Sequence, residues 1–515
     1  MLNSLFISCG LAGAVSASAL ASVPAVASNI TTGTEPCDAL VAAGLRNRML
    51  LPTDGGYEPR IETWYATNTR QHPWCLVLPE STEDVALTLT TLLQADNGAG
   101  DWSIAVKSGG HGYPGSNNVV RGVTIDLGKL NTTTYDAATN IAGVGTGGRW
   151  EYVYADLEKH GVTAVGGRDG DVGVGGFLLG GGTSFFAGQR GFGCDSVVNY
   201  EVVLTNGSVV NANASSHSDL WKALKGGGSN FGIVTRFDLE ALPTRDLYYD
   251  NRVVPLNNSE TVISTVVDFA NHDESEADNA LVALYTYDAK YGNESVIVLI
   301  YANVEGDAEA GTSYDKLQTV PALTNKTEMI TMAEAAAGSK LEGASRGIGA
   351  TILVKNDPAI VRYMTQLHEE LIKTLNKVLK PGSFQVMCIL QPVPSLYGRV
   401  SQQRGGNMLN LENVEGGSVM WTGGVGLKGD EADEAVAHAH FMKTAEKIKA
   451  FSESVNGARD LVYMNYAEPS QDPLGSYGAE NLQFMRDVAA EYDPHGLFQN
   501  WVRGGFKVSK AQSVA

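Results

Sequence analysis

Ser103-Ile-Ala-Val-Lys-Ser-Gly-Gly-His-Gly-Tyr-Pro-Gly115 is the stretch that decides the fold, and the rest of the chain is organised around it. The alternation of apolar Ile104 and Val106 predicts a buried strand, which ends in a loop of four glycines, a proline and a histidine. Because glycine has no Cβ, successive backbone N–H groups in such a loop can turn toward an anionic ligand such as a pyrophosphate. The histidine, His111, can serve there as a metal ligand, a general base or a covalent anchor. No acidic residue or cysteine lies close enough in the sequence to favour a metal.

A second glycine-rich stretch spans residues 166–182, and nine of its 17 residues are glycine. So many glycines do not suit core packing, so the backbone there must pass a ligand or another backbone closely. Their spacing does not give the G-x-G-x-x-G pattern that opens a helix in doubly wound dinucleotide folds. An NAD-dependent dehydrogenase is therefore a poor interpretation of this chain.

Lys107-Ser-Gly-Gly-His111, the glycine-rich stretch and Tyr463-Met-Asn-Tyr466 together resemble the berberine-bridge-enzyme-like FAD-linked oxidases, within the vanillyl-alcohol-oxidase superfamily. The resemblance runs from about Cys37 to Lys507. It implies an α+β fold, with a PCMH-type two-part FAD-binding domain and an α+β substrate domain. In that family the histidine of the R/K-x-G-G-H loop is bonded to the 8α-methyl group of the flavin, and here that residue is His111. The alternative is a turn histidine in a glycine-rich loop.

The resemblance also implies how the flavin is attached. Many relatives bond it a second time through a cysteine, but Asp169 occupies that position here, and a carboxylate cannot form the thioether. We therefore expect FAD to be attached through His111 alone. Three residues later, Val172 stands where the family gates oxygen, and valine there goes with oxidase behaviour. The expected cofactor-binding residues are Lys107, Ser108, Gly109, Gly110, His111, Gly112, Asp169, Val172, Gly173, Gly176, Gly180, Ile233 and Asn465.

Oxidation of a C–H bond by a flavin usually needs a base for the proton of the attached O–H or N–H. In the carbohydrate oxidases that this chain resembles, the second tyrosine of the Tyr-x-Asn-Tyr motif is the base, which implies Tyr466, with Tyr463 as a substrate contact. On a strand over residues 461–466, Tyr463 and Asn465 would share one face and Tyr466 would point the other way, unless a bulge intervenes. The alternative for both tyrosines is a place in the core.

Glu412 is a second candidate for the base. Residues 404–412 resemble a family strand whose last residue, Glu or Gln, faces the substrate. A partly buried carboxylate there would have a raised pKa, which suits proton transfer near neutral pH. The alternative is a solvated glutamate beside Glu415.

The length of 515 residues exceeds one compact core and indicates two packed domains. We predict an FAD-binding domain at residues 35–243, a substrate domain at 244–456 and a C-terminal segment at 457–507 that returns to the FAD-binding domain. Helices are predicted at residues 82–93, 149–160, 358–379, 431–454 and 478–491. Strands are predicted at residues 123–127, 281–287, 296–302, 384–390 and 418–422.

The net charge of −20 would repel nucleic acid and anionic membrane surfaces, so a small-molecule partner is favoured, and we expect a monomer. Residues 1–21 predict a secretory signal, with cleavage possibly as late as residue 27, although a positively charged start is missing. A membrane anchor is the competing interpretation, but the segment is weakly apolar. Glycosylation sequons, which fit a secreted glycoprotein, occur at Asn29, Asn131, Asn206, Asn213, Asn257, Asn293 and Asn325.

Beyond Cys9 in the predicted signal, four cysteines can pair in three ways. In similar proteins an N-terminal cysteine is tied to one just before the flavin domain, which implies a disulfide between Cys37 and Cys75. Cys194 and Cys388 lie in apolar surroundings and are predicted to be buried thiols.

The sequence thus favours a secreted FAD-dependent oxidase that removes hydride from a small organic alcohol or amine, typical of specialised metabolism, and reduces O2 to H2O2. A carbohydrate oxidase is the alternative within the same chemistry. A secreted flavin-fold binding glycoprotein without turnover is the alternative of another class.

Overall fold

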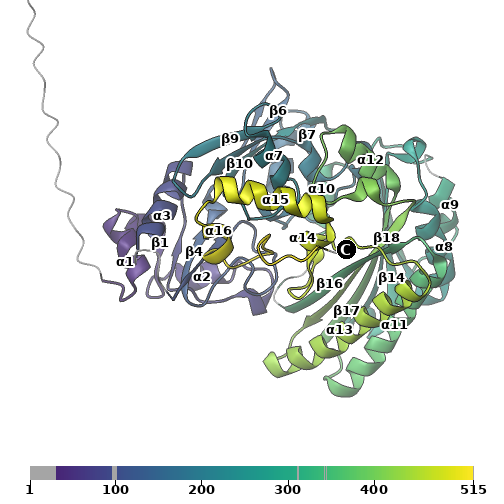
Figure 1. Cartoon of the computed structure of the whole chain (residues 1–515). Coiled ribbons are helices and arrows are strands. Elements are labelled where there is room, and N and C mark those ends of the chain that lie inside the picture. Colours follow the sequence, from purple (N-terminus) through teal and green to yellow (C-terminus); the bar gives the residue numbers. More distant parts are fainter. Residues whose placement is uncertain (1–30, 96–100, 310–311, 342, 344, 514–515) are drawn as a thin grey trace, which may run out of the picture.

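The structure is a computed structural model that describes residues 31–95, 101–309, 312–341, 343 and 345–513. The predicted signal peptide, residues 1–21, lies outside the described residues. Two sheet-based parts lie side by side, and the C-terminal helices return across the first part (Figure 1). None of the described helices combines the length and the apolar character needed to cross a bilayer. The mixed helix and sheet architecture confirms the predicted α+β fold class.

Two main sheets form the first part. In the four-stranded sheet, ordered β1-β2-β4-β3, strand β3 (Ser103–Lys107) pairs in parallel with β4 (Gly122–Asp126), and the loop of His111 leaves the end of β3. The five-stranded sheet is antiparallel and ordered β5-β6-β10-β8-β9. The other strands of this part are β1 (Met49–Leu50), β2 (Cys75–Val77), β5 (Thr133–Asp136), β6 (Ile141–Gly145), β7 (Val162–Thr163), β8 (Val197–Val203), β9 (Val209–Asn213), β10 (Ile233–Glu240) and β11 (Leu242–Pro243).

Helices pack against these sheets, and one of them, α5, lies within the second glycine-rich stretch. Helix α3 begins after Ser81, whose hydroxyl accepts a hydrogen bond from the backbone N–H of Asp84, as an N-cap does. The implied Cys37–Cys75 disulfide is present, and Cys194 and Cys388 are buried free thiols, as predicted. The helices of the first part are α1 (Glu35–Ala42), α2 (Tyr57–Ile61), α3 (Thr82–Gln94), α4 (Trp150–Glu158), α5 (Val174–Leu179), α6 (Ala187–Arg190) and α7 (Ser218–Leu224).

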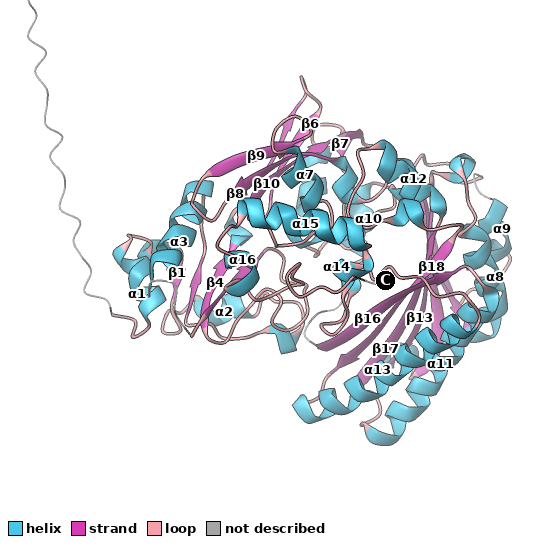
Figure 2. Ribbon diagram, viewed as in Figure 1, coloured by secondary structure: helices cyan, strands magenta, loops and turns pink. Residues whose placement is uncertain are grey.

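The second part is built on a seven-stranded antiparallel sheet, ordered β15-β12-β14-β13-β17-β18-β16. Helices α8, α11 and α13 cover one face of it (Figure 2), and the other face is turned toward the first part. Its strands are β12 (Leu247–Pro255), β13 (Asn279–Asp288), β14 (Glu294–Asn303), β15 (Thr324–Ile330), β16 (Arg346–Lys355), β17 (Phe384–Val393) and β18 (Ser418–Leu427). Its helices are α8 (Ser259–Phe269), α9 (Thr312–Gln318), α10 (Met332–Gly338), α11 (Pro358–Val378), α12 (Ser395–Gln403) and α13 (Glu431–Ser454).

The C-terminal segment joins the two parts. Its helices are α14 (Pro473–Ser476), α15 (Ala479–Tyr492) and α16 (Leu497–Asn500). Leu474 and Leu482 are buried in the same core as residues of the first part and as Leu353 and Met420 of the large sheet. The segment also bonds to the large sheet directly. The side chain of Gln471 accepts a hydrogen bond from the backbone N–H of Thr351 and donates one to the backbone carbonyl of Thr351.

Two predicted strands are wrong. Residues 461–466 form no strand, and Met464–Tyr466 is a single 3₁₀ turn. Residues 404–412 run from the end of α12 through a loop into a second 3₁₀ turn, Leu411–Asn413, and belong to no sheet. Residues 461–466 contain residues that suit strands, whereas residues 404–412 contain two glycines and two asparagines, which do not. Tyr463 and Leu409 both pack against Gly181 of the glycine-rich stretch. Tertiary contacts therefore override the local pattern at residues 461–466.

His368, on α11, makes the stability of the second part pH-dependent. Its side chain is 1% exposed, neither ring nitrogen has a hydrogen-bond partner, and Glu369 lies 3.9 Å away, too far for one. Burial lowers the pKa of His368 from 6.5 to about 3. Between these values the unfolded chain binds a proton that the folded protein does not, so the free energy of unfolding falls as the pH drops.

Replacing His368 with leucine is expected to remove this sensitivity to acid. Urea unfolding at pH 7 and pH 4 gives the difference in the free energy of unfolding between the variant and the parent protein at each pH. This difference should favour the variant by roughly 3 kcal/mol more at pH 4 than at pH 7. Parallel pH dependences of the two proteins would show that His368 is not protonated on unfolding.

Candidate flavin and substrate site

The two glycine-rich stretches cross each other without room for a side chain. A Cβ added at Gly109 would lie 2.5 Å from the Cα of Gly173, and one added at Gly173 would lie 2.4 Å from the Cα of Gly109. The Ser108 hydroxyl, next to this crossing, donates to the carbonyl of Thr146 at 2.7 Å and accepts from the N–H of Gly175 at 3.1 Å. The glycines predicted to bind a cofactor are thus brought together from positions more than 60 residues apart.

Replacing Gly173 with alanine is expected to force the two stretches apart. The added Cβ meets backbone atoms, which cannot move aside as the end of a flexible side chain can, so we expect about 1 to 3 kcal/mol of destabilisation and reduced flavin content. Thermal unfolding and the flavin-to-protein absorbance ratio measure both. Gly55→Ala is the matched control, because a Cβ at Gly55 meets nothing within 4 Å. Equal behaviour of the two variants would contradict the close crossing.

His111 is held by partners that leave one ring nitrogen free. Its Nε2 lies 3.0 Å from Oδ2 of Asp171, and the ring stacks on Tyr65 with centroids 4.5 Å apart. Arg149 holds the other oxygen of Asp171 at 2.9 Å and donates to the carbonyl of Gly109 at 3.0 Å. Within the described residues, Nδ1 of His111 has no hydrogen-bond partner.

Asp171 therefore fixes the tautomer of His111. Burial alone would raise the pKa of Asp171, but the hydrogen bond from His111 and the charge of Arg149 hold it below its usual value. An ionised carboxylate at Nε2 keeps the proton there and leaves the lone pair on Nδ1, where a nucleophile needs it. Sequence reasoning missed Asp171, Arg149 and Tyr65. The only available signal was an acidic residue inside the second glycine-rich stretch.

Lys107 supports the loop from beneath. Its buried ammonium lies 3.1 Å from Asp126, 2.6 Å from the hydroxyl of Thr63 and 3.8 Å above the ring of Trp64. Burial lowers the pKa of Lys107 to about 8, although the charge of Asp126 opposes this. Gly110 lies over this side chain with φ of +77°, and a Cβ added there would come within 2.9 Å of Cε of Lys107. Any other residue would therefore be strained at this position.

The remaining predicted cofactor residues lie around the same crossing. Asp169 is engaged by backbone, since its carboxylate accepts from the N–H groups of Asp171 (2.8 Å) and Leu341 (3.0 Å). Val172 is partly buried against the core, and Ile233 is buried at the start of β10. A Cβ at Gly176 would meet nothing within 4 Å, whereas Gly112 is packed against Ser116 and Gly180 against Asn465.

Tyr463 and Tyr466 have different surroundings. Tyr463 is 2% exposed, and its hydroxyl accepts from the N–H of Gly182 at 2.8 Å and from Asn465 at 3.2 Å. Burial raises the pKa of Tyr463 far above its ordinary value. It fastens the segment to the second glycine-rich stretch, and its contact with substrate stays a prediction. Tyr466 is partly exposed, and its hydroxyl accepts from Arg168 at 3.2 Å.

Gln391 is a site residue that sequence reasoning missed. Near the end of β17, its Oε1 accepts from Arg168 at 2.5 Å, and its Nε2 donates to the hydroxyl of Thr422 at 3.2 Å. It lies on the sheet face turned toward the first part. A polar residue directly after the apolar run at 384–390 was the signal.

Glu412 loses the basis of its assignment, because the strand on which it was placed does not exist. It lies in the turn Leu411–Asn413, and the backbone of that turn packs against Gly398 of α12. No hydrogen bond or ion pair joins Glu412 to Arg168 or Tyr466 in the part of the chain that the structure describes.

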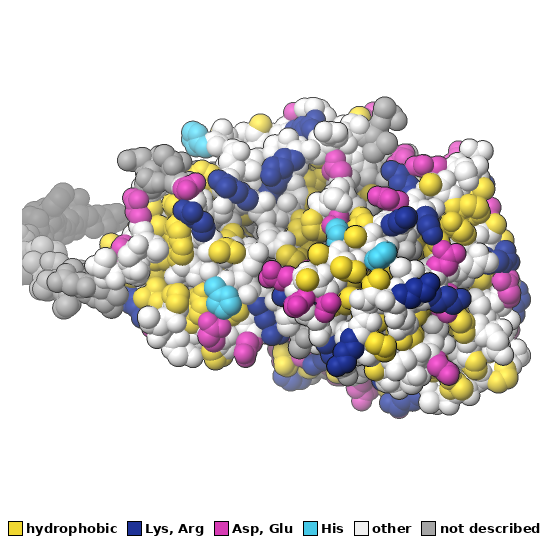
Figure 3. All heavy atoms as spheres, turned by 90° about the horizontal axis from the view of Figure 1, so that it is seen from below, with side chains coloured by type: hydrophobic (Ala, Val, Ile, Leu, Met, Phe, Trp, Pro, Cys, Tyr) yellow, Lys and Arg dark blue, Asp and Glu magenta, His cyan; other side chains and the backbone are white. Residues whose placement is uncertain are grey.

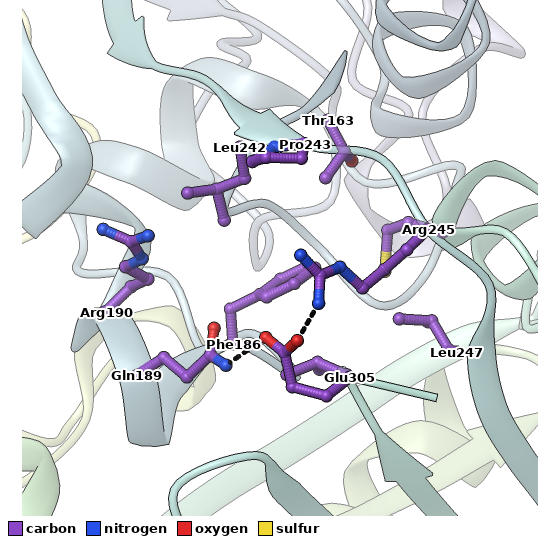
Figure 4. A pocket seen from close by; sticks show the side chains of 11 residues that line it. Thr163, Phe186, Gln189, Arg190, Leu242, Pro243, Arg245, Leu247 and Glu305 are labelled. Atoms are coloured by element: carbon purple, nitrogen blue, oxygen red, sulfur yellow. Dashed lines mark hydrogen bonds and ion pairs between the residues drawn. The ribbon is translucent and has the colours of Figure 1, made fainter. Parts of the chain in front are cut away.

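A separate small pocket lies between the two parts, and it contains none of the predicted site residues. Figure 4 shows Gln189 and Arg245 both directed at Glu305. With a volume of about 50 Å³ and its arginines engaged by acidic residues, it has no room for a flavin or for an organic substrate.

These residues fit a flavin. Gly176, next to the crossing of the two glycine stretches, is exposed with open space around it, and in the described structure Nδ1 of His111 has no hydrogen-bond partner. Residues 73–213 match the model of an FAD binding domain. The FAD-dependent monooxygenase drtC of Aspergillus calidoustus is 33% identical, over 92% of this chain and 90% of its own length. The chain belongs to the family of FAD-dependent oxidoreductases.

Further comparisons support this membership. The FAD-dependent monooxygenase sdcF of Emericella nidulans is 31% identical to this FAD-linked oxidoreductase, over 94% of the chain and 100% of its own length. Berberine bridge enzyme from Eschscholzia californica shares the fold, with a TM-score of 0.72 at 17% identity over 92% of this chain and 99% of that one. Glucooligosaccharide oxidase from Acremonium strictum, described with a 6-S-cysteinyl, 8α-N1-histidyl FAD, has a TM-score of 0.73 at 17% identity, over 94% and 100%.

Proposed function

We propose that this FAD-linked oxidoreductase is a secreted oxidase of a small organic alcohol or amine, that it passes the electrons to O2, and that its FAD is attached through His111 alone. When bound, the flavin supplies the hydride acceptor. The observation that carries the proposal is that His111 and Tyr466 both bond to the second glycine-rich stretch, His111 through Asp171 and Tyr466 through Arg168.

Two residues of the chain have separate roles in removing the proton from the substrate. The substrate loses a hydride from carbon and a proton from the attached O–H or N–H, and Tyr466 is the proposed acceptor of that proton. Arg168 donates to the Tyr466 hydroxyl and stabilises negative charge on its oxygen. Two electrons and two protons then convert O2 to H2O2. Asp169 at the position of the second linkage supports a single bond to the cofactor.

Exposed sequons support secretion as a glycoprotein. Among the sequon asparagines in the described part of the chain, Asn131, Asn206, Asn257, Asn293 and Asn325 are exposed. Basic and acidic side chains are interspersed on the face shown in Figure 3, which offers no continuous basic surface to a nucleic acid. We propose that the protein is a monomer and that its partners are a small-molecule substrate and O2.

A monooxygenase is the second candidate, because the relatives that match at 31% and 33% identity carry that name. Oxidation of a substrate under ¹⁸O2 separates the two reactions. The oxidase proposal predicts one H2O2 for each product molecule and no ¹⁸O in the product. One ¹⁸O atom in each product molecule would establish a monooxygenase instead. Absence of both flavin reduction and H2O2 across a broad panel of alcohols, amines and oligosaccharides would favour the binding glycoprotein.

A further inference from the structure

Arg168 is a cation at the site, and the described residues give it no acidic partner. Its Nη2 donates only to neutral groups, Gln391 at 2.5 Å and Tyr466 at 3.2 Å. No carboxylate among the described residues lies within 4.0 Å of the guanidinium, and its Nε and Nη1 donate no hydrogen bond to any of them. The neighbouring Asp169 is engaged by two backbone N–H groups.

The surroundings of Arg168 are aromatic and amide groups. The ring of Phe185 lies 6.0 Å from the guanidinium, and the side chain of Arg168 is partly buried. A partly buried charge without a counter-ion is unfavourable, and a planar guanidinium with unused donors matches a planar oxyanion. While the Tyr466 hydroxyl is protonated, the site is therefore short of one negative charge, which a ligand can supply.

An apolar surface begins beside this cation. On the face of the large sheet that the helices leave uncovered, Leu284 of β13 stands opposite Ile389 of β17 and Val298 of β14. Val282 stands opposite Ile300 on the same face. All five side chains are partly exposed, whereas alternate residues of these strands are buried beneath the helices.

This apolar surface leads directly to Arg168. Ile389 precedes Gln391 by two residues on β17, so the two side chains share a face and lie about 7 Å apart. The strip of Val282, Leu284, Val298, Ile300 and Ile389 is apolar, and the polar side chains of Asn251, opposite Ile300, and Thr422, opposite Ile389, border it. A sugar that lay on the strip itself would leave the hydroxyl groups facing these five side chains unpaired. A cationic amine would be repelled by Arg168.

We propose that the substrate is a flat apolar molecule with an ionised oxygen, an enolate, phenolate or carboxylate, which Arg168 binds while the apolar body lies on the strip. The proposal rests on the proposed function. The ionised oxygen is a second group of the substrate, separate from the alcohol that loses the hydride and whose proton Tyr466 takes, so the substrate class narrows to alcohols that also carry an anionic oxygen. Arg168 sets specificity, and Tyr466 remains the base.

Calorimetric titration of the oxidised holoprotein at pH 7 tests the proposal without turnover. The probes are 2-hydroxy-1,4-naphthoquinone, whose enol is ionised at this pH, and its neutral methyl ether; 2-naphthoate and 2-naphthamide form a second pair that distinguishes a carboxylate from an enolate. We expect the ionised member of at least one pair to bind roughly tenfold to a hundredfold more tightly than its neutral partner. Arg168→Gln should abolish that preference and leave binding of the neutral member unchanged.

Arg362→Gln, on the helix-covered side of the second part, removes the same charge from an exposed ion pair with Glu260 and should keep the preference. Equal binding of ionised and neutral probes by the parent protein would overturn the proposal even if Arg168→Gln failed to fold. Equal loss of both members in a folded Arg168→Gln would overturn it as well. If the protein prefers the ionised probes but releases no H2O2, the proposed function fails and this inference stands. If the protein releases H2O2 but shows no preference for the ionised probes, this inference fails and the proposed function stands.

Discussion

His111→Ala is expected to yield a protein whose flavin is released completely by acid precipitation. The 8α bond needs a nucleophilic nitrogen, and the structure offers Nδ1 of His111 with its tautomer fixed by Asp171. Alanine removes the nitrogen while the two glycine stretches can still hold flavin non-covalently. Flavin fluorescence of the denatured protein band, compared with flavin in the acid supernatant, measures the change.

His72→Ala is the matched control for this experiment. His72 is 56% exposed and pairs only with Glu58 in the described structure, so its loss should leave all flavin with the protein. Asp171→Asn should slow attachment without abolishing it, because the free nitrogen remains but its tautomer is no longer fixed. Flavin that stays in the acid pellet of His111→Ala would contradict the assignment of the anchor.

Tyr466→Phe is expected to lower kcat by about 10²- to 10⁴-fold, the range typical for loss of a general base. The change removes only the hydroxyl that Arg168 contacts, and the ring still fills its place against Tyr463. Initial rates of H2O2 release with a substrate found by screening, followed across pH, measure the effect. Substrate affinity should change much less than kcat.

Glu412→Gln provides the comparison, since both residues were base candidates in the sequence. With Glu412 in a turn under α12, its variant should stay within a few-fold of the parent kcat. A larger loss in Glu412→Gln than in Tyr466→Phe would restore the carboxylate as the base. Unchanged kcat in both would mean that neither group takes the proton.

Elements with strong local patterns could be predicted from the sequence. Helix α13 has its predicted bounds, and α11 ends one residue early. An aspartate caps the N-terminus of each helix, and α11 is also strongly amphipathic. Strands β12, β15 and β16 were not predicted, since β15 is mostly exposed and polar and β16 carries glycines. Sheet pairing supplies what their local sequences lack.

The candidate site divides in the same way. Its motifs, from His111 to Tyr466, could be found because they are contiguous. Asp171, Arg168 and Gln391 could not be assigned, since their roles depend on contacts between segments up to 298 residues apart. The wrong strand prediction at residues 404–412 has the same origin, because whether that stretch pairs with a sheet could only come from the fold.

Mass analysis of the peptides from the purified protein is the most direct test of the central claim, that a single bond through His111 holds FAD. We predict yellow protein that keeps its flavin on acid denaturation, one FAD mass on the peptide that carries His111 and none on the peptide that carries Asp169. A colourless protein, or flavin that leaves wholly with the supernatant, would contradict a flavin-linked enzyme and favour the binding glycoprotein.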